Sequence, residues 1–216
     1  MKTFVYIDGF NLYYRALKGT AHKWLNLEGL CRAVLPSACD IAQINYYTAR
    51  VTGRINPNSP KDQHAYLRAL GTLESVRIHY GSFQTQDKWM RLAEPLGFRP
   101  PGGISAPLPR YAKVIKTEEK GSDVNLGVHL LRDALTGAFE HAAVITNDTD
   151  LAEPLRIVSH ECGKPITLIS PVSRPAQTLV DLVSHVRHLD GYLSGNQLPA
   201  TLQDLNGRAI VKPSDW

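Results

Sequence analysis

Short apolar runs alternate with amphipathic segments along most of the chain. Runs rich in apolar and β-branched residues predict strands, each bounded by polar residues, glycine or proline, at 2–7, 41–49, 76–80, 111–117, 142–146 and 165–170. Apolar residues at helical spacing predict helices at 12–18, 26–35, 60–73, 123–135, 151–158 and 176–183. Because strand and helix alternate, we expect an α/β fold with a mainly parallel sheet.

Acidic side chains recur where these strands end or helices begin. Asp8 follows the first strand, Asp123 precedes a helix, and Asp148 and Asp150 lie between a strand and the next helix. The carboxyl ends of parallel strands are where α/β proteins keep their sites. If these strands are neighbours, the four acids converge on a site for a hard cation with oxygen ligands.

The same acids have a simpler interpretation. Asp150 or Thr149 can cap a helix, and aspartates are common at such positions by chance. Two carboxylates one residue apart nevertheless repel unless a cation neutralises them, which favours a site.

Three blocks of sequence carry a resemblance to a known family. They are Tyr6-Ile7-Asp8-Gly9-Phe10-Asn11-Leu12, Glu119-Lys120-Gly121-Ser122-Asp123-Val124-Asn125-Leu126 and Thr146-Asn147-Asp148-Thr149-Asp150-Leu151. Their order and approximate spacing resemble the NYN domain family, a branch of the PIN-like nucleases, over residues 1–185. His129 stands where many members repeat an Asp, and Asn147 where many have Gly.

The resemblance implies a fold, a cofactor and an activity. The fold is a three-layer PIN-like sandwich, and the activity is hydrolysis of RNA phosphodiester bonds with Mg²⁺ or Mn²⁺. By position, the metal-site acids are Asp8, Asp123, Asp148 and Asp150, with Asn11 beside them to orient a ligand or the phosphate. The metal would polarise the phosphate and activate a water molecule.

Length and composition fit one nuclease domain. The 216 residues, 43% hydrophobic, can bury a core in residues 1–185, and we expect 186–216 to be a tail or a dimer arm. No apolar run reaches the ~18 residues of a membrane helix, and no signal peptide is evident, so we expect a cytoplasmic protein. The three cysteines lack metal-site spacing and predict inert thiols.

Charge is divided unevenly along the chain. Residues 1–122 hold 17 Lys+Arg and 9 Asp+Glu, a net of +8, whereas residues 123–216 hold 7 and 11, a net of −4. A basic surface beside an acidic pocket suits single-stranded RNA, although ordinary solvated charge explains it too. The candidate RNA contacts are Arg15, Lys18, Arg50, Arg54, Lys113, Lys116, Lys120, Ser122 and Thr149.

The segment 84–110 is the least regular part of the sequence. Five prolines and Gly102-Gly103 predict that it contains no long regular element. Its aromatic and basic residues suit a lid over RNA, while a partner surface or an irregular excursion is the alternative; these residues are Trp89, Phe98, Lys88, Arg91, Arg99 and Arg110.

Two other functions compete with the metal-dependent ribonuclease. A catalytically silent RNA-binding or scaffolding module would use the same fold and basic surface. A phosphatase of the haloacid-dehalogenase type needs a second Asp two residues after Asp8, where this chain has Phe10. We therefore predict a ribonuclease and expect RNA and a second copy of the chain as partners.

Overall fold

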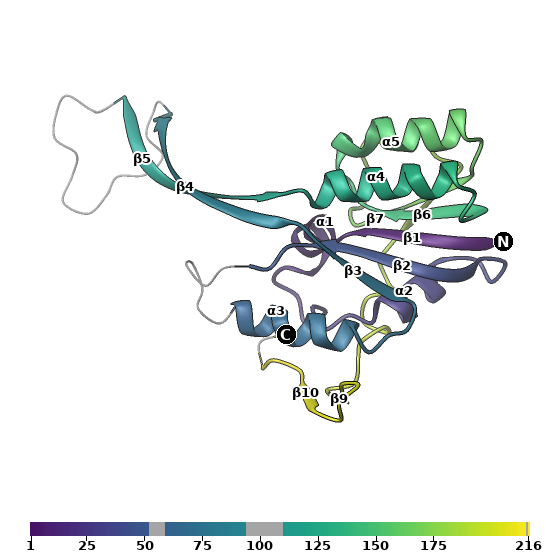
Figure 1. Ribbon diagram of the computed structural model, residues 1–216, viewed down its shortest axis with the longest axis horizontal. Coiled ribbons are helices and arrows are strands. Elements are labelled where there is room, and N and C mark those ends of the chain that lie inside the picture. Colours follow the sequence, from purple (N-terminus) through teal and green to yellow (C-terminus); the bar gives the residue numbers. More distant parts are fainter. Residues whose placement is uncertain (52–58, 94–109, 215) are drawn as a thin grey trace.

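A six-stranded parallel sheet forms the centre of the molecule in the computed structural model, which describes residues 1–51, 59–93, 110–214 and 216 (Figure 1). The strands lie in the order β3–β2–β1–β6–β7–β8. Their bounds are β1 (Lys2–Asp8), β2 (Asp40–Thr48), β3 (Val76–Tyr80), β6 (His141–Ile145), β7 (Ile166–Ser170) and β8 (His185–His188). The sequence order reverses between β1 and β6, so the sheet has a topological switch point there.

Helices cover both faces of this sheet (Figure 1). On one face lie α1 (Gly9–Leu12), its continuation as a π-helical turn (Tyr13–Leu17), α2 (Leu27–Val34) and α3 (Ser59–Leu70). On the other lie α4 (Ser122–Leu135), α5 (Ala152–Arg156) and α6 (Gln177–Val180). A 3₁₀ turn (Thr149–Leu151) precedes α5, and a π-helical turn (Ile157–Glu161) follows it. The predicted three-layer α/β sandwich with a mainly parallel sheet is confirmed.

Strand β1 shows how the sequence builds two cores. Val5 and Ile7 pack with α2 and α3, whereas Phe4 and Tyr6 pack with α4 and α5. This alternation follows from the two-residue period of side chains along a strand. The Tyr6 hydroxyl, inside the second core, donates a hydrogen bond of 2.8 Å to the buried Asp133 carboxylate. The central strand is therefore buried on both faces, as parallel sheets require.

Two further strands leave the body as a long ribbon. They are β4 (Ser82–Arg91) and β5 (Tyr111–Lys120), and they pair antiparallel over their whole length in a separate two-stranded sheet. Figure 1 shows this ribbon, which we call the arm, extending away from the sandwich. Our prediction of no long regular element in 84–110 was wrong for residues 84–91, because the prolines begin only at Pro95. Residues 94–109 lie outside the described part of the chain.

The C-terminal residues pack against the α3 side of the sandwich. Strands β9 (Thr201–Gln203) and β10 (Ala209–Val211) form a small antiparallel pair, and Ile210 is buried in the first core. The Trp24 indole N–H donates to the Pro199 carbonyl at 2.9 Å. Ile210 and Pro199 of this segment thus contact the first core and its Trp24.

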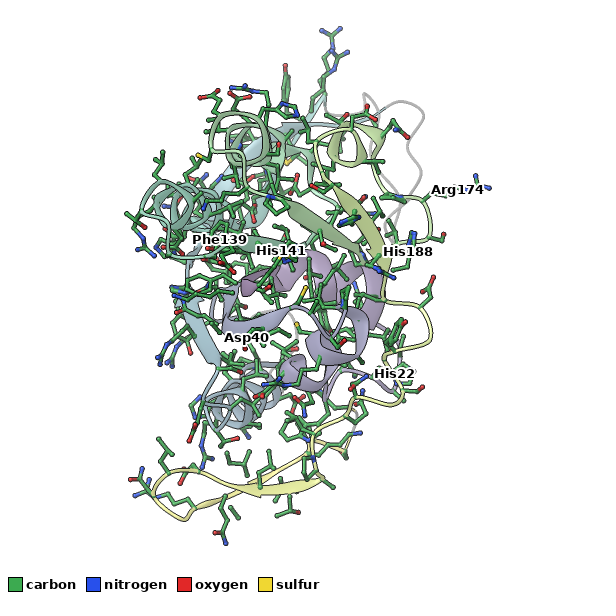
Figure 2. All side chains as sticks on the ribbon, turned by 90° about the vertical axis from the view of Figure 1, so that its right-hand side faces the viewer. His22, Asp40, Phe139, His141, Arg174 and His188 are labelled. Carbon is green, nitrogen blue, oxygen red and sulfur yellow. The ribbon has the colours of Figure 1, made fainter. Side chains whose placement is uncertain are left out.

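A buried histidine, His141, lies at the end of the sheet where the strands begin. Figure 2 views this end and shows His141 in the interior, while His188 and Arg174 lie toward the periphery. The His141 ring nitrogens lie 3.2 Å from Thr3 Oγ1 and 2.9 Å from Thr167 Oγ1. Burial lowers the pKa of His141, so the ring is a neutral structural link between β1, β6 and β7.

We predict that Gly9→Ala weakens the fold at the start of α1. An added Cβ would lie 2.5 Å from the Tyr47 carbonyl oxygen and 2.7 Å from Tyr46 Cζ. We expect a loss of about 1–3 kcal/mol in the free energy of unfolding, measured by urea denaturation, because α1 must move off β2. Gly195→Ala is the control, since its Cβ meets nothing within 4 Å. Equal stability of the two variants would contradict this close packing.

Candidate active-site pocket

A pocket of about 470 Å³ lies where β1 and β6 end and where the arm joins the body. Because β1 and β6 are adjacent, residues from the two strand ends meet in it. One group of lining residues is polar or charged, namely Asp8, Asn11, Arg15, Thr117, Glu119, Ser122, Asp123 and Asp148. The other is aromatic, namely Phe10, Tyr14 and Phe83.

Asp8 is fixed in the pocket by two hydrogen bonds. Its Oδ1 accepts the Asn11 backbone N–H at 2.9 Å, which caps α1, and its Oδ2 accepts the Thr146 hydroxyl at 3.1 Å. The Thr146 Oγ1 in turn accepts the Asp148 N–H at 3.0 Å. The strand ends are thereby tied together through Asp8, which is only 3% exposed.

Asn11 connects the same site to the α6 side. Its Oδ1 accepts the Asn147 N–H at 3.0 Å, and the Asn147 Oδ1 accepts the Ala176 N–H at 2.8 Å. These bonds set the position of the loop that carries Asp148. Sequence reasoning had noted Asn147 only as a departure from the NYN pattern, and it had missed Thr146 as a link.

The buried environment makes Asp8 a weaker acid than an exposed aspartate. Burial, the largest cause, and the neighbouring charges of Asp123 and Asp148 raise its pKa from the usual 3.8 to about 7, even though the hydrogen bonds from Asn11 and Thr146 lower it. The pKa of Asp123 is also raised, first by burial and then by Asp148, Glu119 and Asp150. At neutral pH, Asp8 therefore exchanges a proton readily.

The predicted acids do not all come together. Asp8, Asp123 and Asp148 line the pocket with Asn11, whereas Asp150 is exposed and is not among the lining residues. The Asp148 side chain caps the 3₁₀ turn by accepting the Asp150 N–H at 3.0 Å. Across the ranges that the structure covers, no ion pair involves any of the four acids.

The residues predicted to contact RNA are scattered. Arg15 and Ser122 line the pocket, and Thr149 is exposed beside it. Three lysines on the arm form ion pairs, which are Lys113 with Asp87 and both Lys116 and Lys120 with Glu118.

The remaining predicted contacts lie over aromatic rings or outside the described ranges. Lys18 lies over the Tyr14 ring and Arg50 over the Tyr80 ring. Arg54 is outside the described residues, as are Phe98 and Arg99 of the predicted lid.

Sequence reasoning missed the contribution of the arm. Phe83, Thr117 and Glu119 line the pocket from the base of β4 and β5. Glu119 Oε1 accepts the Ser122 N–H at 3.0 Å and so holds the start of α4. Glu119 belongs to the second of the three blocks that resemble the NYN family. No sequence pattern near Phe83 predicted that it lines the pocket.

Both Asp8 oxygens accept hydrogen bonds from the protein's own backbone and hydroxyl groups, and so does one oxygen each of Asp123, Asp148 and Glu119. In residues 1–51, 59–93, 110–214 and 216, no group of three or more His, Cys, Asp or Glu side chains is arranged to hold a metal ion. The same ranges contain no helix that is both long and apolar enough to cross a bilayer.

Comparison with known proteins adds a relative and a structural neighbour. No family model matches the chain. A protein of unknown function, VPA0982 from Vibrio parahaemolyticus RIMD 2210633, superposes with a TM-score of 0.54 at 16% identity over 91% of this chain and 96% of its own, which shows a shared fold alone.

A curated relative aligns with the entire chain. It is 6-hydroxy-3-succinoylpyridine 3-monooxygenase HspA from Pseudomonas putida (strain DSM 28022 / S16), 30% identical over an alignment of 244 positions that spans 100% of this chain and 75% of HspA. The chain belongs to the HspA family.

Membership in the HspA family corrects several predictions. The metal-dependent ribonuclease, the hydrolase class and the silent RNA-binding alternative gave the wrong function, because the named relative is a monooxygenase. The Mg²⁺ or Mn²⁺ cofactor is also wrong on this finding and on the missing ligand group in the described chain. The physical reason is that Asp8 and Asp148 act as caps, a role that looks identical in sequence to a ligand role.

A flavin or nicotinamide dinucleotide does not fit this pocket in the usual α/β manner. Such cofactors place a pyrophosphate at the helix that follows the first strand, on a glycine-rich turn. Here the turn is Asp8-Gly9-Phe10-Asn11, α1 is four residues long, and the Asp8 carboxylate occupies its N-terminus. Asp123 and Asp148 add negative charge beside it, which repels a phosphate.

We predict a distinctive pH dependence of stability for Asp8→Asn. The pKa of Asp8 is higher in the folded than in the unfolded protein, so Asp8 binds a proton more tightly in the folded state and its contribution to wild-type stability falls as pH rises from 4 to 7. The asparagine removes the decline and should stabilise the protein by roughly 2–4 kcal/mol at pH 8, with no gain below pH 4.

Urea denaturation across this pH range measures the effect. The exposed Asp190→Asn is the control for loss of a negative charge. A stability difference between Asp8→Asn and wild type that does not grow between pH 4 and 8 would rule out the raised pKa.

Proposed function

We propose that this protein is a monooxygenase that hydroxylates a small hydroxylated aromatic ring in the Asp8 pocket. The observation that carries the proposal is the 30% identity to HspA over the whole of this chain, because every pocket residue lies inside the aligned region. The relative's name specifies a hydroxylated pyridine, and we extend only that chemical class to this protein.

The aromatic wall of the pocket supports a flat substrate. Phe10 lies edge-on to Phe83 with ring centroids 5.6 Å apart, and it stacks with Tyr14 at 6.5 Å. Aromatic surfaces of this kind bind planar rings through offset or edge-to-face contacts worth about 0.5–1.5 kcal/mol each. The carboxylates across the pocket would meet the polar edge of such a ring.

Asp8 supplies a base for the ring hydroxyl. A carboxylate whose pKa is about 7 can accept a proton at neutral pH, the condition under which general base catalysis is most effective. Removing the hydroxyl proton increases electron density at the ring carbon in the para position. Positions 3 and 6 in the name of the relative are para to each other. Loss of the proton from a 6-hydroxyl group would therefore increase electron density at position 3, where this name places the oxygenation.

The reaction balances with an external electron donor. One oxygen atom of O₂ enters the ring, and the other leaves as water after accepting two electrons and two protons. Since a resident dinucleotide does not fit the pocket, a reduced flavin supplied from solution would deliver the two electrons, because a reduced nicotinamide does not react directly with O₂. Asp8, once protonated, can return its proton to the solvent as the product leaves.

Arg15 provides a contact for an anionic substituent. It lines the pocket from the π-helical turn after α1, its side chain is exposed, and it forms no ion pair with the residues that the structure describes. A guanidinium forms bidentate hydrogen bonds with a carboxylate. It therefore offsets the repulsion that the three acids would exert on an acidic side chain of the substrate.

Two earlier expectations remain proposals. The three NYN-like blocks each contribute an acid to one pocket, which supports a common ancestry with PIN-like folds without implying nuclease activity. Single-stranded RNA as a partner stays a prediction, supported by the net charge of +8 in residues 1–122.

We predict that Asp8→Asn lowers turnover by about 10²–10⁴-fold, because it removes the base but keeps the shape and the cap. The assay measures O₂ consumption and hydroxylated product with 6-hydroxypyridine derivatives and a reduced nicotinamide or reduced flavin. In the wild type, kcat/KM should fall as pH drops through about 7, while Asp190→Asn should match wild type. A purified wild type that never oxygenates any hydroxylated aromatic ring with either donor refutes the proposed function.

We predict that Arg15→Ala raises KM at least about tenfold for a substrate with a carboxylate side chain, and little for its uncharged amide analogue. Arg15→Lys should recover part of the affinity, since it restores a charge but not the bidentate geometry. Steady-state kinetics with both substrates separates these effects. An equal rise in KM for the two substrates would show that Arg15 does not bind the carboxylate of the substrate.

A further inference from the structure

One side chain that contacts Asp8 has no part yet in the proposed reaction. Thr146 directly follows β6 and is completely buried. The parallel register that pairs Ile7 with Ile145 brings the next residue of each chain segment side by side, so Thr146 lies against Asp8. A buried hydroxyl that contacts a buried carboxylate influences whether that carboxylate is charged.

The two hydrogen bonds of Thr146 have a fixed direction. A hydroxyl group donates one hydrogen bond and can accept two. The Asp148 backbone N–H can only donate, so it uses a lone pair of Thr146 Oγ1, 3.0 Å away. The hydroxyl proton is thereby left for Asp8 Oδ2, which lies 3.1 Å away and accepts it when the carboxylate is ionised. The Asp148 amide therefore orients the hydroxyl toward Asp8.

Thr146 differs in kind from the other donor to Asp8. The hydrogen bond to Asp8 Oδ1 comes from the Asn11 backbone N–H and belongs to the cap of α1. A backbone donor of this kind is present with any residue except proline. Among the side chains in the described ranges, Thr146 alone donates a hydrogen bond to Asp8. Its hydroxyl can therefore be removed by substitution while the cap stays in place.

The other surroundings of Asp8 favour its neutral form. Asp8 is buried, and two further acids, Asp123 and Asp148, line the same pocket. Burial and nearby negative charges each favour a protonated carboxyl group, whereas a donated hydrogen bond favours the ionised one. A protonated Asp8 could not accept the proton of a substrate hydroxyl. The Thr146 hydroxyl thus opposes the conditions that would inactivate the base.

We propose that Thr146 is a positioning residue that keeps Asp8 ionised near neutral pH and holds its carboxylate in one orientation toward the substrate hydroxyl. Thr146 is not among the residues that line the pocket, so it acts through Asp8 and not on the substrate. The proton transfer itself is unchanged, because the substrate hydroxyl still gives its proton to the Asp8 carboxylate. This inference deepens the proposed function and rests on it.

The first experiment measures stability against pH by urea denaturation and needs no turnover. Thr146→Val removes the hydroxyl but keeps the shape, and Thr146→Ser keeps the hydroxyl and is the matched control. Without the hydroxyl, the pKa of Asp8 in the folded protein should rise by about one pH unit above its value of about 7. The contribution of Asp8 to stability then continues to fall with rising pH beyond the point at which it levels off in wild type.

The expected result is a stability difference that depends on pH. The difference between Thr146→Val and wild type should be constant below pH 6 and should grow between pH 6 and 9. The difference between Thr146→Ser and wild type should stay constant over the whole range. In an Asp8→Asn background, Thr146→Val should cost the same at every pH, because the group through which Thr146 acts no longer titrates.

The second experiment is the pH profile of kcat/KM with a 6-hydroxypyridine substrate and a reduced flavin. The acidic limb of the profile should move upward by about one pH unit in Thr146→Val and not in Thr146→Ser. At pH 6, Thr146→Val should therefore be about tenfold slower than Thr146→Ser, and at pH 9 the two should be similar. A loss of the same size at every pH would show that Thr146 has only a structural role.

The two experiments separate this inference from the proposed function. A wild type that oxygenates no hydroxylated ring refutes the proposed function, while the stability measurements still decide whether Thr146 controls the charge of Asp8. A Thr146→Val stability difference that is independent of pH, or a Thr146→Ser protein that shifts as far as Thr146→Val, would overturn the inference. If Thr146→Val does not fold, Thr146→Ala removes the same hydroxyl and takes its place in both comparisons.

Discussion

The carboxylate of Asp8 is the constraint on which the rest of the pocket depends. It is buried at the point where β1 and β6 end, and it accepts one hydrogen bond from each side of that junction. An ionised carboxylate in this position is unfavourable, which is why its pKa is raised to about 7. The residue that ties the strand ends together is therefore also the one most able to exchange a proton.

The same carboxylate limits which ligands the fold can accept. Open α/β sheets bind nucleotide phosphates at a free helix N-terminus beside the switch point. In this chain Asp8 fills that position, and Asp123 and Asp148 surround it with further negative charge. The pocket is suited to a flat ring with a proton to lose, held against Phe10 and Phe83. It is unsuited to the pyrophosphate of a resident dinucleotide.

Much of the fold could be predicted from periodicity. The six strands of the prediction all occur, and β1 and β6 are adjacent as the positions of Asp8 and Asp148 required. Strand β8 was missed because His185–His188 has little apolar signal. Strand β4 of the arm was missed because its length is set by pairing with a strand 20 or more residues away, and the sequence of a single strand carries no such information.

The chemistry of the site was harder to predict than its position. Asp8, Asn11, Asp123 and Asp148 do share a pocket, but a cap and a metal ligand require the same residue at the same place. Only three-dimensional contacts reveal that the Asp8 oxygens are occupied by Asn11 and Thr146. Phe83 reaches the pocket from a strand whose prediction failed, so the aromatic wall could not be anticipated.

Isotopic labelling of the product tests the central claim that the Asp8 pocket performs oxygenation. The purified protein is supplied with a hydroxylated pyridine and an external electron donor, once under ¹⁸O₂ in ordinary water and once under ordinary O₂ in H₂¹⁸O. The account predicts one ¹⁸O atom in the ring hydroxyl of the product in the first case and none in the second. Oxygen derived from water, or label that is incorporated equally well by Asp8→Asn, would contradict it.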